Sequence, residues 1–188
     1  MKVNSKGYIF PESEKKTEKD EIQETAWVSV FNCLTVVVCL LIAVSVVFSM
    51  FFKVVQVDGV SMAPTLNDNE SLLVYTMNYT PEAGDIVVIG ESCKIREAMV
   101  KRIIATQDQT VSVDYESGKV FVDGVELNEN YVTSMTKPDE NEIKYPYTVP
   151  SGCVFVMGDN RDESGDSRSK SIRAVDVNHI VGKVLNRS

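Results

Sequence analysis

An uncharged, strongly apolar run from Ala26 to Phe52 constrains this chain more than any other feature. At about 1.5 Å of rise per residue, a helix of this length exceeds the roughly 30 Å hydrocarbon thickness of a bilayer, so we predict a membrane-spanning helix over residues 26–52. The alternative is a cleaved signal peptide, whose apolar region usually has about 7 to 15 residues and is followed by small residues. This run is longer and ends in Met50-Phe51-Phe52-Lys53, which favours a retained anchor.

Basic residues near the two ends of the run predict its orientation. Lys15, Lys16 and Lys19 precede it, whereas only Lys53 follows closely. Because positively charged flanks stay on the cytoplasmic side, we expect a single-pass protein of the plasma membrane. Residues 1–25 would be a polar cytoplasmic tail, and residues 53–188 would form an extracytoplasmic catalytic domain.

Residues 53–188 contain short β-branched runs separated by turns, which predicts a mainly β, antiparallel fold. Glu116-Ser117-Gly118-Lys119 and Val122-Asp123-Gly124-Val125 are typical of hairpin turns, and no long helical periodicity follows Phe52. Residues 134–150 are polar and indicate a long loop. The runs that we expect to be strands are Leu72–Tyr75, Ile86–Ile89, Thr110–Val113, Lys119–Val122 and Val154–Met157.

The balance of charge argues against a nucleic-acid partner. The chain has 19 basic and 27 acidic residues and a net charge of −8, whereas phosphate binding needs dense basic patches. Of the 4 cysteines, Cys33 and Cys39 lie in the apolar run. Cys93 and Cys153 are too far apart in sequence for a zinc pattern, and either a disulfide or two buried thiols would suit them. We expect no metal and no cofactor.

A candidate nucleophile follows the apolar run, in the stretch Gly59-Val60-Ser61-Met62-Ala63-Pro64-Thr65-Leu66. Pro64 fixes one backbone angle, and Gly59 permits a conformation that other residues resist. Such a turn can hold the Ser61 hydroxyl off the regular path of a strand and exposed for reaction. A structural turn would explain an isolated serine equally well, so the assignment depends on a base elsewhere in the chain.

Two side chains could take the proton from Ser61. His179 is the single histidine of the chain and lies in a strand-like stretch near the C-terminus. A surface histidine without a catalytic role is the simpler interpretation. Lys101 interrupts the apolar run from Met99 to Ala105. Burial there would lower the pKa of Lys101 toward the range in which the neutral amine is a usable base, as in a Ser/Lys dyad. The alternative is an edge-strand lysine that opposes aggregation.

A polar loop runs from Gly158 to Arg168, directly after the expected strand Val154–Met157. Its carboxylates suit a calcium loop, but the required alternation and distant Glu are absent, and Arg161 and Arg168 stand among the would-be ligands. We interpret the segment as a loop that Asp/Arg pairs stabilise and that offers hydroxyls to a nearby catalytic group. A plain solvated loop is the alternative.

Four segments in order resemble the type I signal peptidases of bacteria, which are membrane-anchored serine proteases that remove signal peptides from exported proteins. The resemblance extends from the anchor to the C-terminus and implies a mainly β catalytic domain. Ser61 would be the nucleophile, and Lys101 would be the general base. The segments are Ser61–Leu66, Gly84–Val88, Val100–Ile104 and Gly158–Arg168.

The resemblance also implies supporting roles. The Ser61 backbone N–H would bind the oxyanion, and a second donor near Gly59 is unassigned, because one branch of the family has a serine hydroxyl at that position. A serine hydroxyl at the position of Ser164 would orient the lysine amine. Two ion pairs would serve as scaffolding for the dyad: Asp159 with Arg102, and Asp166 with Arg168.

The expected substrate is an extended peptide with small residues at alternate positions before the cut. It would lie alongside Val54–Asp58, with Val57 and Met62 as candidate contacts. Expected partners are the signal peptides of preproteins and the lipid bilayer. The alternative function is that of a non-catalytic relative that acts as a chaperone in pilus or surface-protein assembly. Such a relative should lack the serine or the lysine, whereas this chain has both Ser61 and Lys101.

Overall fold

The computed structural model describes residues 2–3, 9–10, 18–92, 95, 97–134, 136, 138 and 140–187. The chain divides into two units, residues 1–47 and residues 48–188. The first unit holds the short antiparallel strands β1 (Lys2–Val3) and β2 (Ile9–Phe10) and most of helix α1 (Glu18–Phe51).

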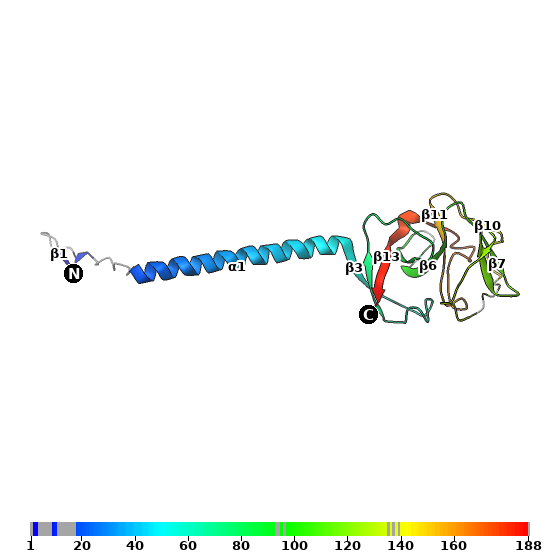
Figure 1. Ribbon diagram of the computed structural model, residues 1–188, viewed down its shortest axis with the longest axis horizontal. Coiled ribbons are helices and arrows are strands. Elements are labelled where there is room, and N and C mark those ends of the chain that lie inside the picture. The colour runs from blue at the N-terminus through cyan, green and yellow to red at the C-terminus, as the bar shows by residue number, and fades with distance from the viewer. Residues whose placement is uncertain are drawn as a thin grey trace. The chain divides into compact units, whose positions relative to one another are not determined.

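Helix α1 contains the apolar run (Figure 1). Its stretch Ala26–Phe51 is long and apolar enough to cross a membrane, and its large side chains are exposed, as for Trp27 at 67%. The helix begins at Glu18, before the apolar run, because the intervening residues are good helix formers with acidic side chains near the N-terminus. The helix ends at Phe51, because Phe52 pairs with Tyr75 and begins a strand.

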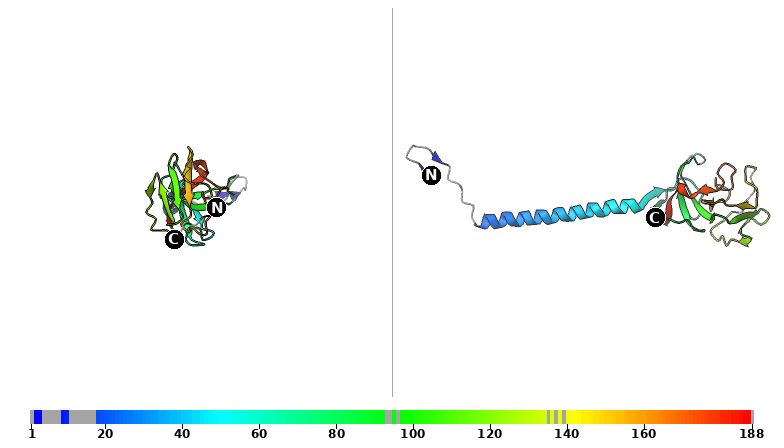
Figure 2. Two further views of the ribbon diagram at one scale, coloured as in Figure 1. Left: turned by 90° about the vertical axis from the view of Figure 1, so that its right-hand side faces the viewer. Right: turned by 90° about the horizontal axis from the view of Figure 1, so that it is seen from above.

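The second unit is built from two antiparallel sheets. The larger sheet has the strand order β12-β11-β6-β5-β13-β4-β3, and the smaller has the order β10-β7-β8-β9. Strands β7 and β10 lie on the side of this unit away from β3 and β13 (Figures 1 and 2). The larger sheet contains β3 (Phe52–Gln56), β4 (Ser71–Tyr75), β5 (Ile86–Ile89), β6 (Met99–Ala105), β11 (Cys153–Met157), β12 (Val175–Asp176) and β13 (Ile180–Arg187). The smaller contains β7 (Thr110–Asp114), β8 (Lys119–Val122), β9 (Val125–Glu126) and β10 (Tyr147–Thr148).

The predicted mainly β, antiparallel fold with an N-terminal apolar helix is confirmed. All five expected strands are present, and β7, β8 and β9 form the two expected hairpins. Within the expected loop 134–150, the described residues Tyr147 and Thr148 form β10, and Glu142 makes a bridge with Ser169. After α1, the described part of the chain has one further helix, the short 3-10 helix η1 (Val177–His179).

The core follows the alternation of the strands. In β4, Leu72 and Val74 point inward and are fully buried, with 0% exposure. They form one cluster with Met62 and Leu66, so the turn around Ser61 is anchored in the core by its own apolar side chains. A second cluster joins the two sheets, because Phe155 and Met157 of β11 pack with Val111 and Val120 of the smaller sheet.

Candidate active site

The turn that carries Ser61 follows the end of β3 and has a well-defined backbone. Gly59 has a φ of 93°, and its N–H donates to Asp68 Oδ1 at 2.8 Å. The N–H of Ala63 donates to the carbonyl of Val60 at 3.0 Å. Glycine is suited to the left-handed conformation at position 59, where a side chain would be strained. The chain therefore turns at Gly59, shortly after β3 ends at Gln56, and presents Ser61 from a tight turn.

Lys101 lies in β6 and meets Ser61 directly. Its Nζ is 2.6 Å from Ser61 Oγ, within hydrogen-bond distance. The Lys101 residue is only 3% exposed. Burial lowers the pKa of Lys101 below its usual range, because the charged amine loses its hydration; the negative charges of Asp166 and Asp159 oppose this shift. The structure thus places a desolvated amine against the candidate nucleophile.

His179 is not at this site. It lies in η1, is exposed, and lines a separate cavity beside Cys153 and Asp176. Cys93 lies outside the described residues, so the two pairing alternatives for Cys93 and Cys153 stay predictions.

The loop after β11 approaches the Ser61 turn closely at Gly158. A Cβ atom at this position would lie 2.2 Å from Ser164 Oγ and 2.4 Å from the Ser61 carbonyl oxygen. Both distances are far below van der Waals contact, so only glycine lets the loop approach the Ser61 turn this closely. The Gly158 N–H donates to Asp166 Oδ2 at 3.0 Å, which fixes the start of the loop.

Asp166 and Arg168 form the buried ion pair that the resemblance implied. Arg168 Nε donates to Asp166 Oδ1 at 2.8 Å, and Arg168 Nη2 donates to Asp166 Oδ2 at 2.9 Å. The guanidinium also donates to the carbonyl of Arg161 at 2.9 Å. Such a two-pronged, buried contact determines the geometry as well as contributing energy. Because Asp166 also accepts the Gly158 N–H, the pair is connected to both ends of the loop.

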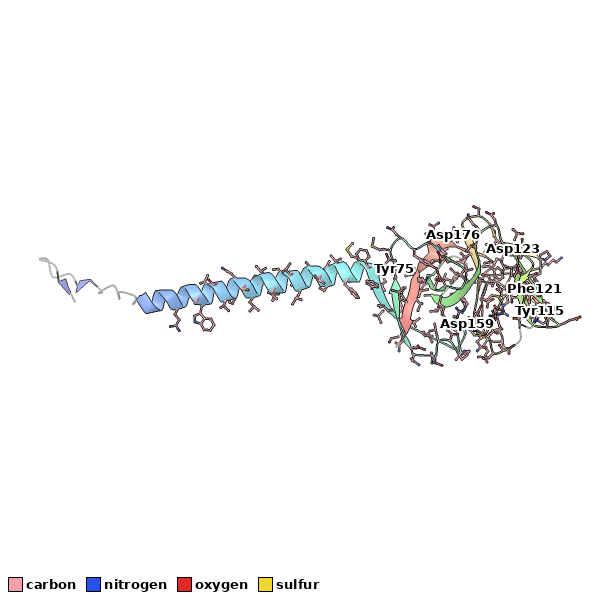
Figure 3. All side chains as sticks on the ribbon, in the orientation of Figure 1. Tyr75, Tyr115, Phe121, Asp123, Asp159 and Asp176 are labelled. Atoms are coloured by element: carbon pink, nitrogen blue, oxygen red, sulfur yellow. The ribbon has the colours of Figure 1, made fainter. Side chains whose placement is uncertain are left out.

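The second implied pair joins β6 to the same loop. Arg102 Nε and Nη2 donate to the two oxygens of Asp159 at 2.8 and 2.6 Å. The guanidinium also donates to the carbonyl of Gly84 at 2.9 Å and lies 3.9 Å from the centre of the Tyr131 ring. Asp159 falls between Tyr75 of the larger sheet and Tyr115 beside the smaller one in Figure 3. Since Arg102 follows Lys101 directly, this pair ties the strand of the candidate base to the loop.

Arg161 is a supporting residue that the sequence did not reveal. It is only 3% exposed and donates to the carbonyl of Gly158 and to Thr136 Oγ1, both at 3.1 Å. Its Nη1 donates to Glu129 Oε2 at 3.1 Å. A polar loop gives no signal that one of its arginines is buried, because the partner Glu129 lies in a distant segment.

Ser164 is close to the dyad without a bond to it. Its Oγ is buried and has no hydrogen-bond partner among the residues that the structure describes. The hydrogen bond between Ser164 and Lys101 that the resemblance implies is therefore absent from this conformation. A buried hydroxyl without a partner is costly, which makes this group conspicuous.

Ser61 and Lys101 line an open groove of about 480 Å³. The segments Val55–Asp58 and Glu97–Val100 also line it, and the second leads into Lys101. Strands β3 and β6 are separated in the sheet by β5, β13 and β4, so the sheet must curve for both to reach the groove. Val57 and Met62, our candidate substrate contacts, line it but are only 5% and 1% exposed.

Both of these lining segments have a backbone edge that could accept another strand. In the described pairing, β3 is hydrogen bonded to β4 alone, and β6 meets β11 only from Arg102 onward.

Among the described residues, no group of three or more His, Cys, Asp or Glu side chains could hold a metal ion.

Comparison with known proteins identifies the family. Residues 29–187 match the family model described as "Signal peptidase, peptidase S26". The signal peptidase I of Bacillus licheniformis is 32% identical over 164 residues, which cover 82% of this chain and 86% of the relative. The signal peptidase I T of Bacillus subtilis is 38% identical over 142 residues, or 70% of each chain. A signal peptidase I crystal structure from Enterococcus faecalis is 27% identical and covers 57% of this chain and 98% of its own, with a TM-score of 0.46. This chain therefore belongs to the signal peptidase family, peptidase S26.

Proposed function

We propose that this protein is a membrane-anchored serine endopeptidase that removes signal peptides from exported preproteins, with Ser61 as nucleophile and Lys101 as general base. The observation that carries the proposal is the 2.6 Å contact between Lys101 Nζ and Ser61 Oγ, made by a lysine that is 3% exposed. A desolvated amine with a lowered pKa is neutral at a lower pH than a surface lysine. It can then accept the hydroxyl proton.

We expect the reaction to proceed in two stages. Ser61 Oγ attacks the peptide carbonyl carbon while its proton passes to Lys101 Nζ. The resulting ammonium gives the proton to the leaving amine, and the signal peptide stays attached to Ser61 as an ester. Lys101 then takes a proton from water, the hydroxide attacks the ester, and the proton returns to Ser61 Oγ. The signal peptide leaves as a carboxylate.

The oxyanion needs donors on the opposite side from Lys101. The Ser61 N–H is our first donor. The Gly59 N–H already donates to Asp68, so it does not supply the second one in this conformation. We propose that the Ser164 hydroxyl orients the Lys101 amine once substrate is bound, since it is buried, close to Gly158 and without a partner of its own among the described residues.

The groove supports an extended substrate. A peptide between Val55–Asp58 and Glu97–Val100 could form backbone hydrogen bonds to β3 and β6, with alternate side chains turned into the groove. Val57 and Met62 would contact those side chains, and the limited space would favour small ones. Helix α1 would span the plasma membrane with its N-terminus in the cytoplasm. Tethering would raise the local concentration of preproteins embedded in the same membrane.

A cleavage assay tests the proposal. The purified full chain in detergent is incubated with a model preprotein, and the products are weighed by intact-mass spectrometry. We expect a single cut after a small residue with wild type and none with Ser61→Ala or Lys101→Ala. Lys119→Ala is the matched control, because Lys119 lies in the smaller sheet, pairs with Glu126 and is half exposed. Wild-type cleavage by either dyad variant would exclude the dyad. Binding of the preprotein without cleavage by wild type would favour the chaperone alternative.

A further inference from the structure

Asn160, in the loop after β11, makes two contacts that no role described so far uses. Its backbone N–H donates to the Ser61 carbonyl at 3.0 Å. Its side-chain Nδ2 donates to the Val60 carbonyl at 3.1 Å. Two consecutive carbonyls of the nucleophile turn are therefore held by one residue from a distant part of the chain.

The contact to Val60 also determines where the Ser61 N–H points. A peptide unit is planar and trans, so the Val60 carbonyl and the Ser61 N–H lie in one plane and point in opposite directions. Asn160 Nδ2 and the Ala63 N–H both donate to this carbonyl, so together they fix its direction and that of the Ser61 N–H. A carbonyl that accepts a hydrogen bond also polarises its amide, which makes the N–H a better donor.

The rest of the turn leaves this N–H available. The Gly59 N–H is engaged by Asp68, and the Ala63 N–H is engaged by the Val60 carbonyl. The Ser61 N–H has no hydrogen-bond partner within the described parts of the chain. It is therefore available to a substrate oxyanion, and the Asn160 amide bonds the carbonyl at the opposite edge of the same peptide unit.

We propose that Asn160 is a positioning residue for the oxyanion hole: its side-chain amide orients the Val60–Ser61 peptide so that the Ser61 N–H meets the developing oxyanion. This inference rests on the proposed function. In the described structure Asn160 donates to the Val60 and Ser61 carbonyls and has no hydrogen bond to Lys101, so we expect its effect to appear in the transition state. Binding of the uncleaved substrate and the titration of the base should not depend on it.

Two variants of the full chain separate this role from a general structural one. Asn160→Asp keeps the shape of the side chain but removes the amide donor, and Asn160→Ala removes the donor without adding charge. Both keep the backbone N–H that donates to Ser61. We expect kcat to fall about tenfold or more in each variant, whereas KM should stay within about twofold of wild type. Complete loss of an oxyanion donor costs about 10²–10³-fold in kcat, and in these variants the Ser61 N–H is still present but points in the wrong direction. Since Lys101 must be neutral to act, we expect kcat/KM to rise with pH, and the midpoint of this rise should be the same in both variants and in wild type.

Inhibition by a peptide aldehyde gives the decisive readout. The aldehyde forms a hemiacetal with Ser61, whose oxygen occupies the oxyanion position, and its inhibition constant does not depend on the fraction of active enzyme. We expect this constant to rise in both Asn160 variants by the same factor by which kcat/KM falls. Asn78→Asp, the same exchange at an exposed loop position, should change neither value.

Each outcome bears on a different claim. If wild type cleaves the substrate and the two Asn160 variants keep wild-type kcat and aldehyde inhibition, the positioning role is wrong and the proposed function stands. A fall in kcat with unchanged aldehyde inhibition would also overturn it, because the defect would then lie outside the oxyanion hole. If wild type itself fails to cleave, the proposed function and this inference fall together.

Discussion

Lys101 and Ser61 touch at 2.6 Å from opposite environments: the lysine is buried within the sheet, whereas the serine is half-buried in the wall of an open groove. The base is thus desolvated before any substrate arrives, and the nucleophile remains reachable. The loop after β11 keeps the buried base next to the accessible nucleophile.

Burial of the Lys101 amine should cost stability. Because burial lowers its pKa below the 10.5 of the unfolded chain, the folded protein carries the full penalty at pH values below the folded pKa, where the amine is charged. The penalty is relieved as pH rises from the folded pKa toward 10.5. We expect Lys101→Met to be inactive but more stable at neutral pH, by about 1–4 kcal/mol, with a gain that shrinks at alkaline pH. Urea unfolding at several pH values measures this. A less stable Met variant at neutral pH would contradict it.

Two buried serine hydroxyls of the loop after β11 should respond in opposite ways to substitution by alanine. Ser164 Oγ has no partner in the described structure, so Ser164→Ala should leave stability unchanged or slightly raised. If Ser164 orients the Lys101 amine, kcat should fall about tenfold to a hundredfold. The Ser167 hydroxyl accepts the N–H of Val156 at 2.9 Å, so Ser167→Ala should lower the unfolding free energy by about 1–3 kcal/mol. Thermal melts with kinetics distinguish the two. An active Ser164→Ala enzyme would rule out the orienting role.

The close approach at Gly158 should be essential for activity. In Gly158→Ala, the new methyl group would overlap the Ser61 carbonyl, which is backbone and cannot move aside without shifting the nucleophile turn. A shift of about 1 Å at a reacting group can cost about a hundredfold in rate. Gly165→Ala is the control in the same loop, because a Cβ there meets nothing within 4 Å. We expect at least a hundredfold loss of kcat/KM for the first variant and little change for the second. Equal rates for both would show that the loop adapts.

The Asp166–Arg168 pair should be required for folding as well as for rate. In Asp166→Asn, the buried Arg168 guanidinium would lose its charge partner inside the protein, where an unpaired charge costs about 3–5 kcal/mol. The amide could also present its NH₂ group to the Gly158 N–H. Asp108→Asn provides the control, because Asp108 is an exposed turn residue whose positive φ asparagine also tolerates. Chemical denaturation should show a large loss for the first variant only. A loss below about 1 kcal/mol would mean that the pair is not structural.

The parts of this molecule that sequence could predict are those in which one residue breaks a local pattern. Lys101 stands out because it interrupts an apolar strand, and Ser61 stands out because Gly59 and Pro64 surround it. The alternation in β4 and β8 likewise predicts which side chains turn inward. Each of these signals lies within a few neighbouring residues.

The parts that sequence could not predict depend on contacts between distant segments. In the sequence, Arg161 is one of several charged residues in a polar loop. Its burial depends on its partner Glu129, which lies in a distant segment of the chain. Asn160 likewise gives no local sign of its bonds to Val60 and Ser61. The family resemblance supplied the pairing of Asp159 with Arg102, which spacing alone could not indicate.

The titration of Lys101 against the rate of cleavage tests the central claim most directly. The dependence of kcat/KM on pH would be measured between about pH 6 and 11 for the full chain, and the Lys101 amine of the same sample would be titrated by NMR with labelled lysine, assigned through Lys101→Met. The account predicts that the rate rises with pH and that its midpoint coincides with the Lys101 midpoint, below 10.5. A rate that does not follow the Lys101 titration, or a Lys101 pKa at or above 10.5, would contradict its role as the base.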